Sequence, residues 1–272
     1  MSQTWYSDDD PTDPPISLRG WLRILRRGLL LGLNTFGCLL LLLLIRVVER
    51  PVFGARRPVT PWITQYVCRS AFLVMGMGYH VEGRPMAGPG ALVSNHASWL
   101  DIFALNAPQR IYFVSKAEVA GWPGIGWLAR ATGTLFIRRE RGQAAAQRAQ
   151  FMERLEAGHR LLFFPEGTST DGRRVLSFRS TLFAAFFEDG LPEMSLQAVT
   201  LVYQAPEGRD VRFYGWWGGM TFEEHLLKVL AVRRPGSVRV VFHKPVPLSD
   251  LKGRKDAATR LEDVVRSGLT AG

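Results

Sequence analysis

The sequence predicts an α/β domain with a mostly parallel central sheet flanked by helices, preceded by N-terminal membrane-anchoring helices. Three observations lead to this fold class. The 272 residues are enough for one large domain with its own core, and two cysteines supply no disulfide framework. Beyond residue 79, short apolar runs alternate with helical stretches, as in sheets whose strands are connected by helices. The longest uncharged apolar run, residues 28–45, precedes this region.

The chain divides into three parts. Residues 1–18 carry four aspartates, three prolines and no basic residue, a composition that predicts a disordered acidic tail. Residues 19–78 are expected to form membrane-anchoring helices, and residues 79–272 the α/β domain. The sequence contains no internal repeat and no glycine-rich phosphate-binding loop.

The basic charge is concentrated around the apolar run. Residues 19–69 contain nine arginines and one glutamate, hence +8 of the net +10. An 18-residue helix is about 27 Å long, just short of a ~30 Å hydrocarbon core, so it either spans the bilayer or dips into one leaflet. Arginines on both sides of the run favour contact with anionic lipid, and residues 61–79 are expected to return as an interfacial helix. A buried core helix is the alternative.

The elements of the third part follow from its residue pattern. Short runs rich in apolar and β-branched residues predict strands at 79–82, 91–94, 111–115, 134–138, 160–164, 195–203, 211–214 and 238–243. Longer stretches with helical spacing predict helices at 100–107, 125–131, 143–157, 181–189 and 222–232.

The first candidate site, S-N-H-A-S-W-L-D, follows the strand at 91–94. This places His96 at the carboxyl end of a strand, where the ligand sites of α/β sheets gather. If Asp101 lies in the first turn of the next helix, its carboxylate folds back onto the imidazole. Such a pair fixes the tautomer of a general base and stabilises its imidazolium. In the alternative, Ser98 and Asp101 form only a capping box.

Two further motifs end predicted strands. F-P-E-G-T-S-T presents Glu166 and three hydroxyl groups after Pro165 ends the ladder, with Gly167 permitting a tight turn. A plain turn is the alternative. G-T-L-F-I-R-R ends in Arg138 and Arg139, whose guanidinium groups suit phosphate, the alternative being a solvated helix start.

Together, N-H-A-S-W-L-D, G-T-L-F-I-R-R and F-P-E-G-T resemble the first three motif blocks of the glycerolipid acyltransferases, nearest the bacterial 1-acyl-sn-glycerol-3-phosphate (lysophosphatidic acid) acyltransferases. The resemblance covers roughly residues 79–215. It implies transfer of an acyl chain from acyl-CoA or acyl carrier protein to lysophosphatidic acid, giving phosphatidic acid. It implies no bound cofactor and no metal, and a location on the cytoplasmic face of the bacterial inner membrane.

The resemblance also implies residue roles. His96 deprotonates the acceptor hydroxyl, and Asp101 orients its imidazole. Glu166 and Gly167 shape the acceptor site, and backbone N–H groups near Gly167 are expected to bind the oxyanion. Arg139 contacts the acceptor phosphate. Positions of second rank are Thr168, Arg138, Asn95 and Ser98.

The sequence departs from the family pattern at three positions. Arg138 stands where aspartate is usual, Ser169 where arginine is usual, and Ala198 where the fourth block usually has proline. Without an arginine at 169, the phosphate contact falls to Arg138, Arg173 or Arg179, or the head group is not a simple phosphate. The variant F-P-E-G-T-S-T-D-G resembles a branch that includes lyso-ornithine lipid acyltransferases, which gives the alternative acceptor.

Three other classes of protein are weaker fits. The intact set of His96, Asp101 and Glu166 weighs against a non-catalytic membrane lipid-binding protein. A metal hydrolase would need a third ligand cluster, which the sequence does not offer. No nucleic-acid partner is expected, because the arginines flank an apolar run and no recognised binding module is present.

Tryptophans form a separate group of candidates. Trp122 and Trp127 are expected at the lip of an acyl-chain tunnel near the bilayer surface, and Trp216 and Trp217 in a similar place. Ordinary core positions are the alternative for all four.

Overall fold

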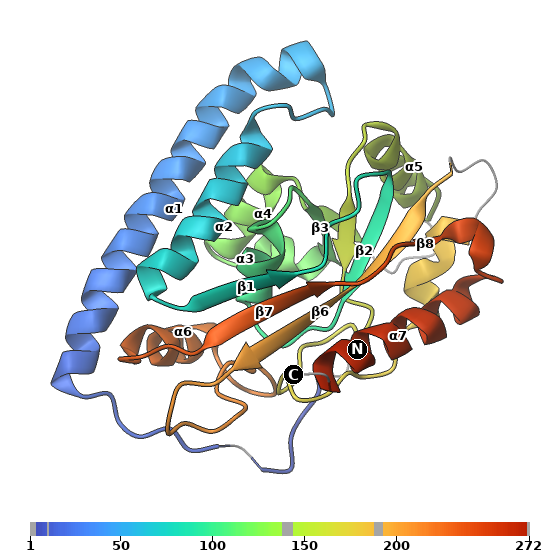
Figure 1. Ribbon diagram of the computed structural model, residues 1–272. Coiled ribbons are helices and arrows are strands. Elements are labelled where there is room, and N and C mark those ends of the chain that lie inside the picture. Colours follow the sequence, from blue (N-terminus) through green and yellow to red (C-terminus); the bar gives the residue numbers. More distant parts are fainter. Residues whose placement is uncertain (1–3, 10, 138–143, 188–192, 271–272) are drawn as a thin grey trace.

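The computed structural model describes residues 4–9, 11–137, 144–187 and 193–270 of the chain. Two N-terminal helices precede an α/β domain (Figure 1). The strands are β1 (Gly78–Glu82), β2 (Gly90–Ser94), β3 (Tyr112–Lys116), β4 (Leu135–Ile137), β5 (Leu161–Phe163), β6 (Ser195–Gln204), β7 (Ser237–Phe242) and β8 (Val246–Pro247). The α-helices are α1 (Leu18–Phe53), α2 (Thr60–Met75), α3 (Asp101–Asn106), α4 (Ile125–Thr132), α5 (Ala144–Glu156), α6 (Phe222–Ala231) and α7 (Arg254–Thr270). Shorter 3₁₀ helices are η1 (Ala117–Gly121), η3 (Ser180–Phe187) and η4 (Leu248–Asp250).

In the described part of the chain, eight strands form one sheet in the order β1-β7-β6-β2-β5-β3-β4, with β8 pairing β6. Every pairing is parallel except those of β6 with β7 and with β8. All five residues of the central strand β2 are buried, as expected for a parallel strand covered on both faces. The predicted fold class, an α/β fold with a mostly parallel sheet, is confirmed.

Successive residues of β2 contribute to two separate cores. Leu92 belongs to the core closed by α2, α3 and α6. Ala91 and Val93 belong to the core closed by α5, η3 and α7. The sheet is therefore the middle layer of three, because side chains alternate between the two faces of a strand.

The N-terminal helix α1 is 36 residues long and runs beside α2 along one edge of the molecule (Figure 1). Its first turn is capped by Ser17, whose hydroxyl accepts the N–H of Gly20 at 3.2 Å. The helix is long and apolar enough to cross a membrane. Its outward face exposes many leucine, valine and aromatic side chains. Helix α2 likewise exposes Trp62, Tyr66 and Leu73.

Part of the arginine charge around α1 is used inside the protein. Buried Arg27 donates to the carbonyl oxygens of Leu230 and Val232 at 2.9 and 2.6 Å. Arg57 donates to the carbonyl oxygen of Ala131 at 2.8 Å. Because these guanidinium groups satisfy carbonyls where helices end, they join α1 and its following turn to the domain. The exposed flanking arginines are Arg19, Arg26, Arg50 and Arg56.

Two sequence predictions differ from the structure. The strand predicted at 211–214 is wrong, because these residues form consecutive turns. The helix predicted at 181–189 is the 3₁₀ helix η3, of which the described part ends at Phe187. Residues 4–9 and 11–17, within the tail predicted to be disordered, lie against the α/β domain through contacts such as Trp5 with Trp217.

Candidate active site

The two main motifs meet at one edge of the sheet. His96 follows β2, and Glu166 follows β5. The two strands are adjacent and parallel, with Val93 paired to Phe163. Their carboxyl ends therefore place both motifs together, as the sequence predicts. The backbone N–H of His96 donates to Glu166 Oε1 at 2.8 Å.

His96 and Asp101 form a close pair. His96 Nδ1 lies 2.7 Å from Asp101 Oδ2, and the carboxylate is completely buried. The same oxygen accepts the backbone N–H groups of Ala97 and Ser98 at 2.8 and 3.0 Å. A carboxylate that accepts these bonds requires a donor on the ring, so Nδ1 carries the proton and Nε2 is left as the base.

The catalytic and capping alternatives for Asp101 turn out to be compatible. The bond from the Ser98 N–H to Asp101 resembles the carboxylate half of a capping box, and the Ser98 hydroxyl accepts the N–H of Leu100 at 3.3 Å, although the N-cap of α3 itself is Leu100. Capping therefore holds the carboxylate in the position from which it orients His96.

Two residues around this pair have no role in the sequence predictions. The Tyr203 hydroxyl, at the end of β6, donates to Asp101 Oδ1 at 2.6 Å. Burial and the neighbouring Asp101 raise the pKa of Tyr203 well above its ordinary value, so it stays a donor. Phe164 stacks on the His96 ring with centroids 4.0 Å apart. Phe164 is the first residue of the F-P-E-G-T motif, and Tyr203 is an aromatic residue close to the fourth block, 197–200. The sequence gives no other signal for the contacts that these two residues make.

Glu166 holds backbone rather than facing solvent. Its second oxygen accepts the N–H of Leu176 at 2.7 Å, so the carboxyl group joins the His96 turn to residue 176. Burial raises the pKa of Glu166 to about 8, although these two N–H bonds act in the opposite direction. The predicted acceptor-site residue thus supports the backbone beside His96.

The turn after Glu166 explains the glycine at 167. Gly167 has φ +75°, and a Cβ there would lie 3.1 Å from the Arg179 guanidinium carbon. Its N–H donates to the Phe164 carbonyl at 3.1 Å, so this N–H group is already used and does not supply the expected oxyanion contact.

Other predicted site residues have structural partners. The Asn95 side chain exchanges two hydrogen bonds with the backbone of Leu201, at 2.9 and 2.8 Å. The Ser169 hydroxyl donates to the Trp216 carbonyl at 2.5 Å. The Thr168 hydroxyl donates to the carbonyl of Ser169 at 3.3 Å. Arg138 and Arg139 lie outside the described residues.

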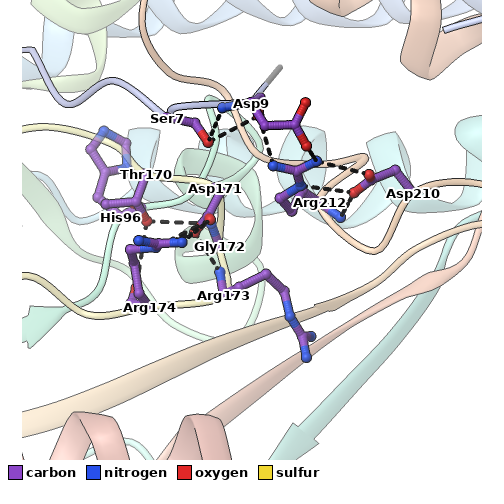
Figure 2. Close-up of polar contacts among 10 residues, drawn as sticks. All are labelled: Ser7, Asp9, His96, Thr170, Asp171, Gly172, Arg173, Arg174, Asp210 and Arg212. Carbon is purple, nitrogen blue, oxygen red and sulfur yellow. Dashed lines mark hydrogen bonds and ion pairs between the residues drawn. The ribbon is translucent and has the colours of Figure 1, made fainter. Parts of the chain in front are cut away.

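The arginines considered as replacements at position 169 are in different environments. Arg174 pairs with buried Asp171 at 2.9 Å. The Arg173 side chain is exposed and points away from His96 (Figure 2). Arg179 lies against Gly167, beside the catalytic turn. By position, Arg179 is the closest of the three to the F-P-E-G-T motif.

His96 lies at an apolar cavity of about 680 Å³ between the N-terminal helices and the domain. Residues from α1, α2, α3, η1 and α4 line it, including Phe36, Val67 and Leu128. Trp122 and Trp216 also line it and meet edge to face, with centroids 6.4 Å apart. Trp127 is exposed and Trp217 is buried, and neither lines the cavity. The volume is typical of a ligand site.

Two loops hold the backbone of the turn that contains His96. The N–H of Thr170 donates to the His96 carbonyl at 2.9 Å, and the N–H of Trp216 donates to the Ala97 carbonyl at 2.8 Å. Figure 2 shows His96 beside the loop that contains Thr170 and Arg174. Within the described residues, no group of three or more His, Cys, Asp or Glu side chains is placed to hold a metal ion.

A histidine–carboxylate pair beside an apolar cavity, at the carboxyl edge of an α/β sheet, is an arrangement suited to an acyl-group transferase. The chain belongs to the glycerolipid acyltransferase family. Residues 79–196 match the family model described as Acyltransferase.

Similar proteins agree with this assignment. The lyso-ornithine lipid O-acyltransferase of Rhodobacter capsulatus is 55% identical over 97% of this chain and 96% of its own. That of Pseudomonas aeruginosa is 34% identical over 90% of this chain and 93% of its own. The crystal structure of a 1-acyl-sn-glycerophosphate (LPA) acyltransferase from Thermotoga maritima has a TM-score of 0.64. It is 21% identical and covers 93% of this chain and 96% of its own, which supports the fold.

Proposed function

We propose that this acyltransferase transfers a fatty acyl chain from a thioester donor, acyl-CoA or acyl carrier protein, to the free hydroxyl of lyso-ornithine lipid. The observation that carries the chemistry is the His96–Asp101 pair, whose histidine lines the apolar cavity. Two relatives that align along nearly the whole chain support the acceptor. Lysophosphatidic acid, the acceptor favoured by motif resemblance alone, becomes the competing substrate.

The geometry accounts for each step of transfer. Nε2 of His96 takes the proton of the acceptor hydroxyl while Asp101 holds Nδ1. The resulting alkoxide oxygen attacks the thioester carbonyl carbon and forms the new C–O bond. When the tetrahedral intermediate collapses, the C–S bond breaks, and the thiolate takes the proton from the His96 imidazolium. His96 returns to its neutral form, and no covalent acyl-enzyme is required.

The cavity is suited to the fatty chain. Its lining residues are predominantly apolar side chains from helices and from the segment 122–125, so burial of methylene groups is favourable there. His96 and Phe164 lie among the residues that line it. A chain held in this cavity would bring its thioester carbonyl to His96, where the acceptor hydroxyl is activated.

The head-group difference supports the choice of acceptor. An ornithine head group carries a carboxylate and an ammonium group, whereas lysophosphatidic acid carries a phosphate. Position 169, where the phosphate-binding family pattern has arginine, is a serine whose hydroxyl is bonded to the Trp216 carbonyl. A neutral side chain that is already paired supplies no cation for phosphate.

The proposed place of action is a membrane surface. The outward faces of α1 and α2 expose many large apolar side chains, including Leu33, Phe36 and Trp62. Exposed arginines at both ends of α1 favour the anionic lipid of the cytoplasmic face of a bacterial inner membrane. The lysolipid acceptor then reaches His96 from the same lipid layer.

A thiol-release assay tests this proposal. Purified protein is given acyl-CoA or acyl carrier protein donors with either lyso-ornithine lipid or lysophosphatidic acid, and the acylated lipid is identified by mass spectrometry. We expect lyso-ornithine lipid to be used roughly tenfold or more faster, because the serine at position 169 replaces the arginine that the family pattern places there for phosphate. Equal or faster use of lysophosphatidic acid would contradict the acceptor assignment. Lysolipid binding without thiol release would contradict catalysis itself.

A further inference from the structure

The acidic N-terminal segment lies on the loops behind the catalytic turn. We call residues 4–9 and 11–17 the strap. It leads from Trp5 to Ser17, the residue that caps α1, and therefore connects the membrane-facing helix with the α/β domain. None of the catalytic steps above uses it.

Trp5 joins two loops that are far apart in the sequence. Its N–H donates to the Thr168 hydroxyl at 3.5 Å, and its carbonyl accepts the N–H of Gly218 at 3.1 Å. Its ring meets Trp217 edge to face at 5.9 Å and lies 4.8 Å from the Arg174 guanidinium carbon. Both ring contacts are of recognised stabilising types.

Arg174, which lies over the Trp5 ring, is itself held in place by an ion pair. It pairs with Asp171 at 2.9 Å, and buried Asp171 also accepts the N–H of Arg173 at 3.0 Å. Figure 2 shows Asp171 and Arg174 beside Thr170 and His96. The loop surface that receives Trp5 is therefore held in place by a buried carboxylate.

The same two loops hold the catalytic backbone. Thr170 bonds the His96 carbonyl from one loop, and Trp216 bonds the Ala97 carbonyl from the other. The bond from the Ser169 hydroxyl to the Trp216 carbonyl connects the two loops directly. Trp5 connects them a second time through its bonds to Thr168 and Gly218, so two separate links oppose movement of one loop relative to the other.

Ion pairs fasten the rest of the strap. Asp9 lies 3.5 Å from Arg212, which also pairs with Asp210 (Figure 2). Asp13 lies 3.1 Å from Lys228 and 3.6 Å from Arg209. These pairs are at the surface, so each is weak and sensitive to salt. The strap is therefore a fastening that can be loosened without unfolding the core.

We propose that Trp5 is a positioning residue for acyl transfer, because it clamps the loops 168–174 and 215–218 whose N–H groups hold the carbonyls of His96 and Ala97. The inference rests on the proposed role of His96 as general base. Trp5 itself touches neither the catalytic pair nor the cavity lining.

The first test compares Trp5→Ala, Trp5→Phe and a chain lacking residues 1–9. We expect Trp5→Ala and the truncation to lower kcat on the order of tenfold, since a small displacement of a catalytic group is enough for such a loss. KM for donor and acceptor should stay within about twofold, because no substrate contact is removed. Trp5→Phe should restore most of kcat, as a phenyl ring keeps the contacts with Trp217 and Arg174.

A second readout does not depend on activity. Hydrogen exchange of the Thr170 and Trp216 amides should be faster in Trp5→Ala and in the truncated chain than in the unchanged protein. If the chain transferred no acyl group to any acceptor, the proposed function would be wrong. The hydrogen exchange of the two amides would still test whether Trp5 holds the loops. Unchanged exchange at both amides would overturn the clamp, as would unchanged or increased kcat.

A matched pair of charge variants tests the fastening. Asp13→Asn removes the partner of Lys228 and Arg209, whereas Asp8→Asn removes an equal charge from an exposed residue for which no ion pair is found among the described residues. At low salt, the kcat of Asp13→Asn should equal the kcat that the unchanged protein has at high salt. The kcat of Asp8→Asn should equal that of the unchanged protein at each salt concentration. Equal effects of the two variants, or a rise in KM alone, would contradict the proposal.

Discussion

At the scale of single residues, His96 has one ring nitrogen committed to Asp101 and one left for the acceptor. Loss of the imidazole removes the base, so we expect His96→Ala to reduce acyl transfer on the order of a thousandfold. His80→Ala, which removes an exposed histidine on β1, is the matched control. Thiol release and thermal unfolding should be measured for both. Near-normal turnover of His96→Ala in a folded protein would refute the mechanism.

Tyr203 provides a second test at the same scale. Tyr203→Phe removes the only hydrogen bond described to Asp101 Oδ1, at a cost of about 1.5–3 kcal/mol in unfolding free energy, as for a bond to a charged group. We also expect kcat to fall, because the carboxylate that orients His96 is less firmly held. Tyr79→Phe removes a 2.9 Å bond to the Ala104 carbonyl and should reduce stability alone. Urea unfolding and kcat distinguish the two outcomes.

The sequence predicts the local half of this site but not the distant half. The pairing of His96 with Asp101 follows from five-residue spacing across a strand end and a helical turn. The position of Glu166 near His96 is predicted because both residues follow the carboxyl ends of predicted strands. Tyr203 is 102 residues from Asp101, and only the register of β6 beside β2 brings its hydroxyl there. Trp5 is further still from its partners, in a tail whose composition predicts disorder.

At the scale of elements, the pattern of apolar residues predicts most of the sheet. It fails where a side chain forms a hydrogen bond with the neighbouring backbone and imposes a turn. Residues 211–214 alternate like a strand, but the Asp210 carboxylate accepts the N–H of Arg212 at 2.7 Å and imposes a turn. The residue pattern predicts no element at α7. Its buried positions are largely small, such as Ala257, Ala258 and Gly268, and give a weak apolar pattern.

His225 links α6 to the start of α3. It accepts the indole N–H of Trp99 on Nδ1 at 2.9 Å, and its Nε2 lies 2.9 Å from the Gly215 carbonyl. Burial, with a smaller effect of Lys228, lowers the pKa of His225 to about 3. Protonation would remove the acceptor that Trp99 needs.

The consequence is loss of stability in acid. Between pH 6.5 and about 3 the unfolded chain binds a proton at His225 that the folded chain does not. The unfolding free energy therefore falls as pH falls through this window, by up to about 1.4 kcal/mol per pH unit for one proton. Denaturant titrations at several pH values should show a shallower slope in His225→Gln. An identical slope would contradict the assignment.

The attachment of α1 along the domain predicts its orientation to the membrane. The helix is about 54 Å long at 1.5 Å per residue. It is fixed near its start by Arg27 to α6 and near its end by Glu49, which accepts the Thr60 hydroxyl at 2.7 Å. Arg57, just after α1, also bonds the Ala131 carbonyl of α4, so both ends are held to the same side of the protein. We therefore expect α1 to lie in one leaflet rather than cross the bilayer.

Labelling from one side tests this orientation. Single cysteines at Ser17 and Gly54, with Cys38 and Cys68 replaced by alanine, should both react with an impermeant maleimide on the same side of sealed vesicles. Reaction on opposite sides would show that the helix spans the membrane.

At the scale of the whole molecule, the apolar cavity belongs to both parts of the chain. Its walls come from α1 and α2 on one side and from the α/β domain on the other, so neither part could bind an acyl chain in this way alone. The internal bonds of Arg27 and Arg57 are what keep these walls together. Some of the basic charge that sequence analysis assigns to lipid therefore maintains the shape of the proposed substrate site.

Two glycines of α1 test this shared cavity. Gly32 lines it, Gly37 is exposed and does not, and a Cβ at either would meet nothing within 4 Å. Gly32→Leu should therefore fill part of the cavity and lower kcat/KM for long-chain donors by about tenfold relative to short-chain ones, since one misfitting methylene group is worth 10–200-fold. Gly37→Leu adds the same volume outside and should leave chain-length preference unchanged. Acyl-CoA donors of graded length provide the measurement, and equal chain-length profiles for both variants would place the acyl chain elsewhere.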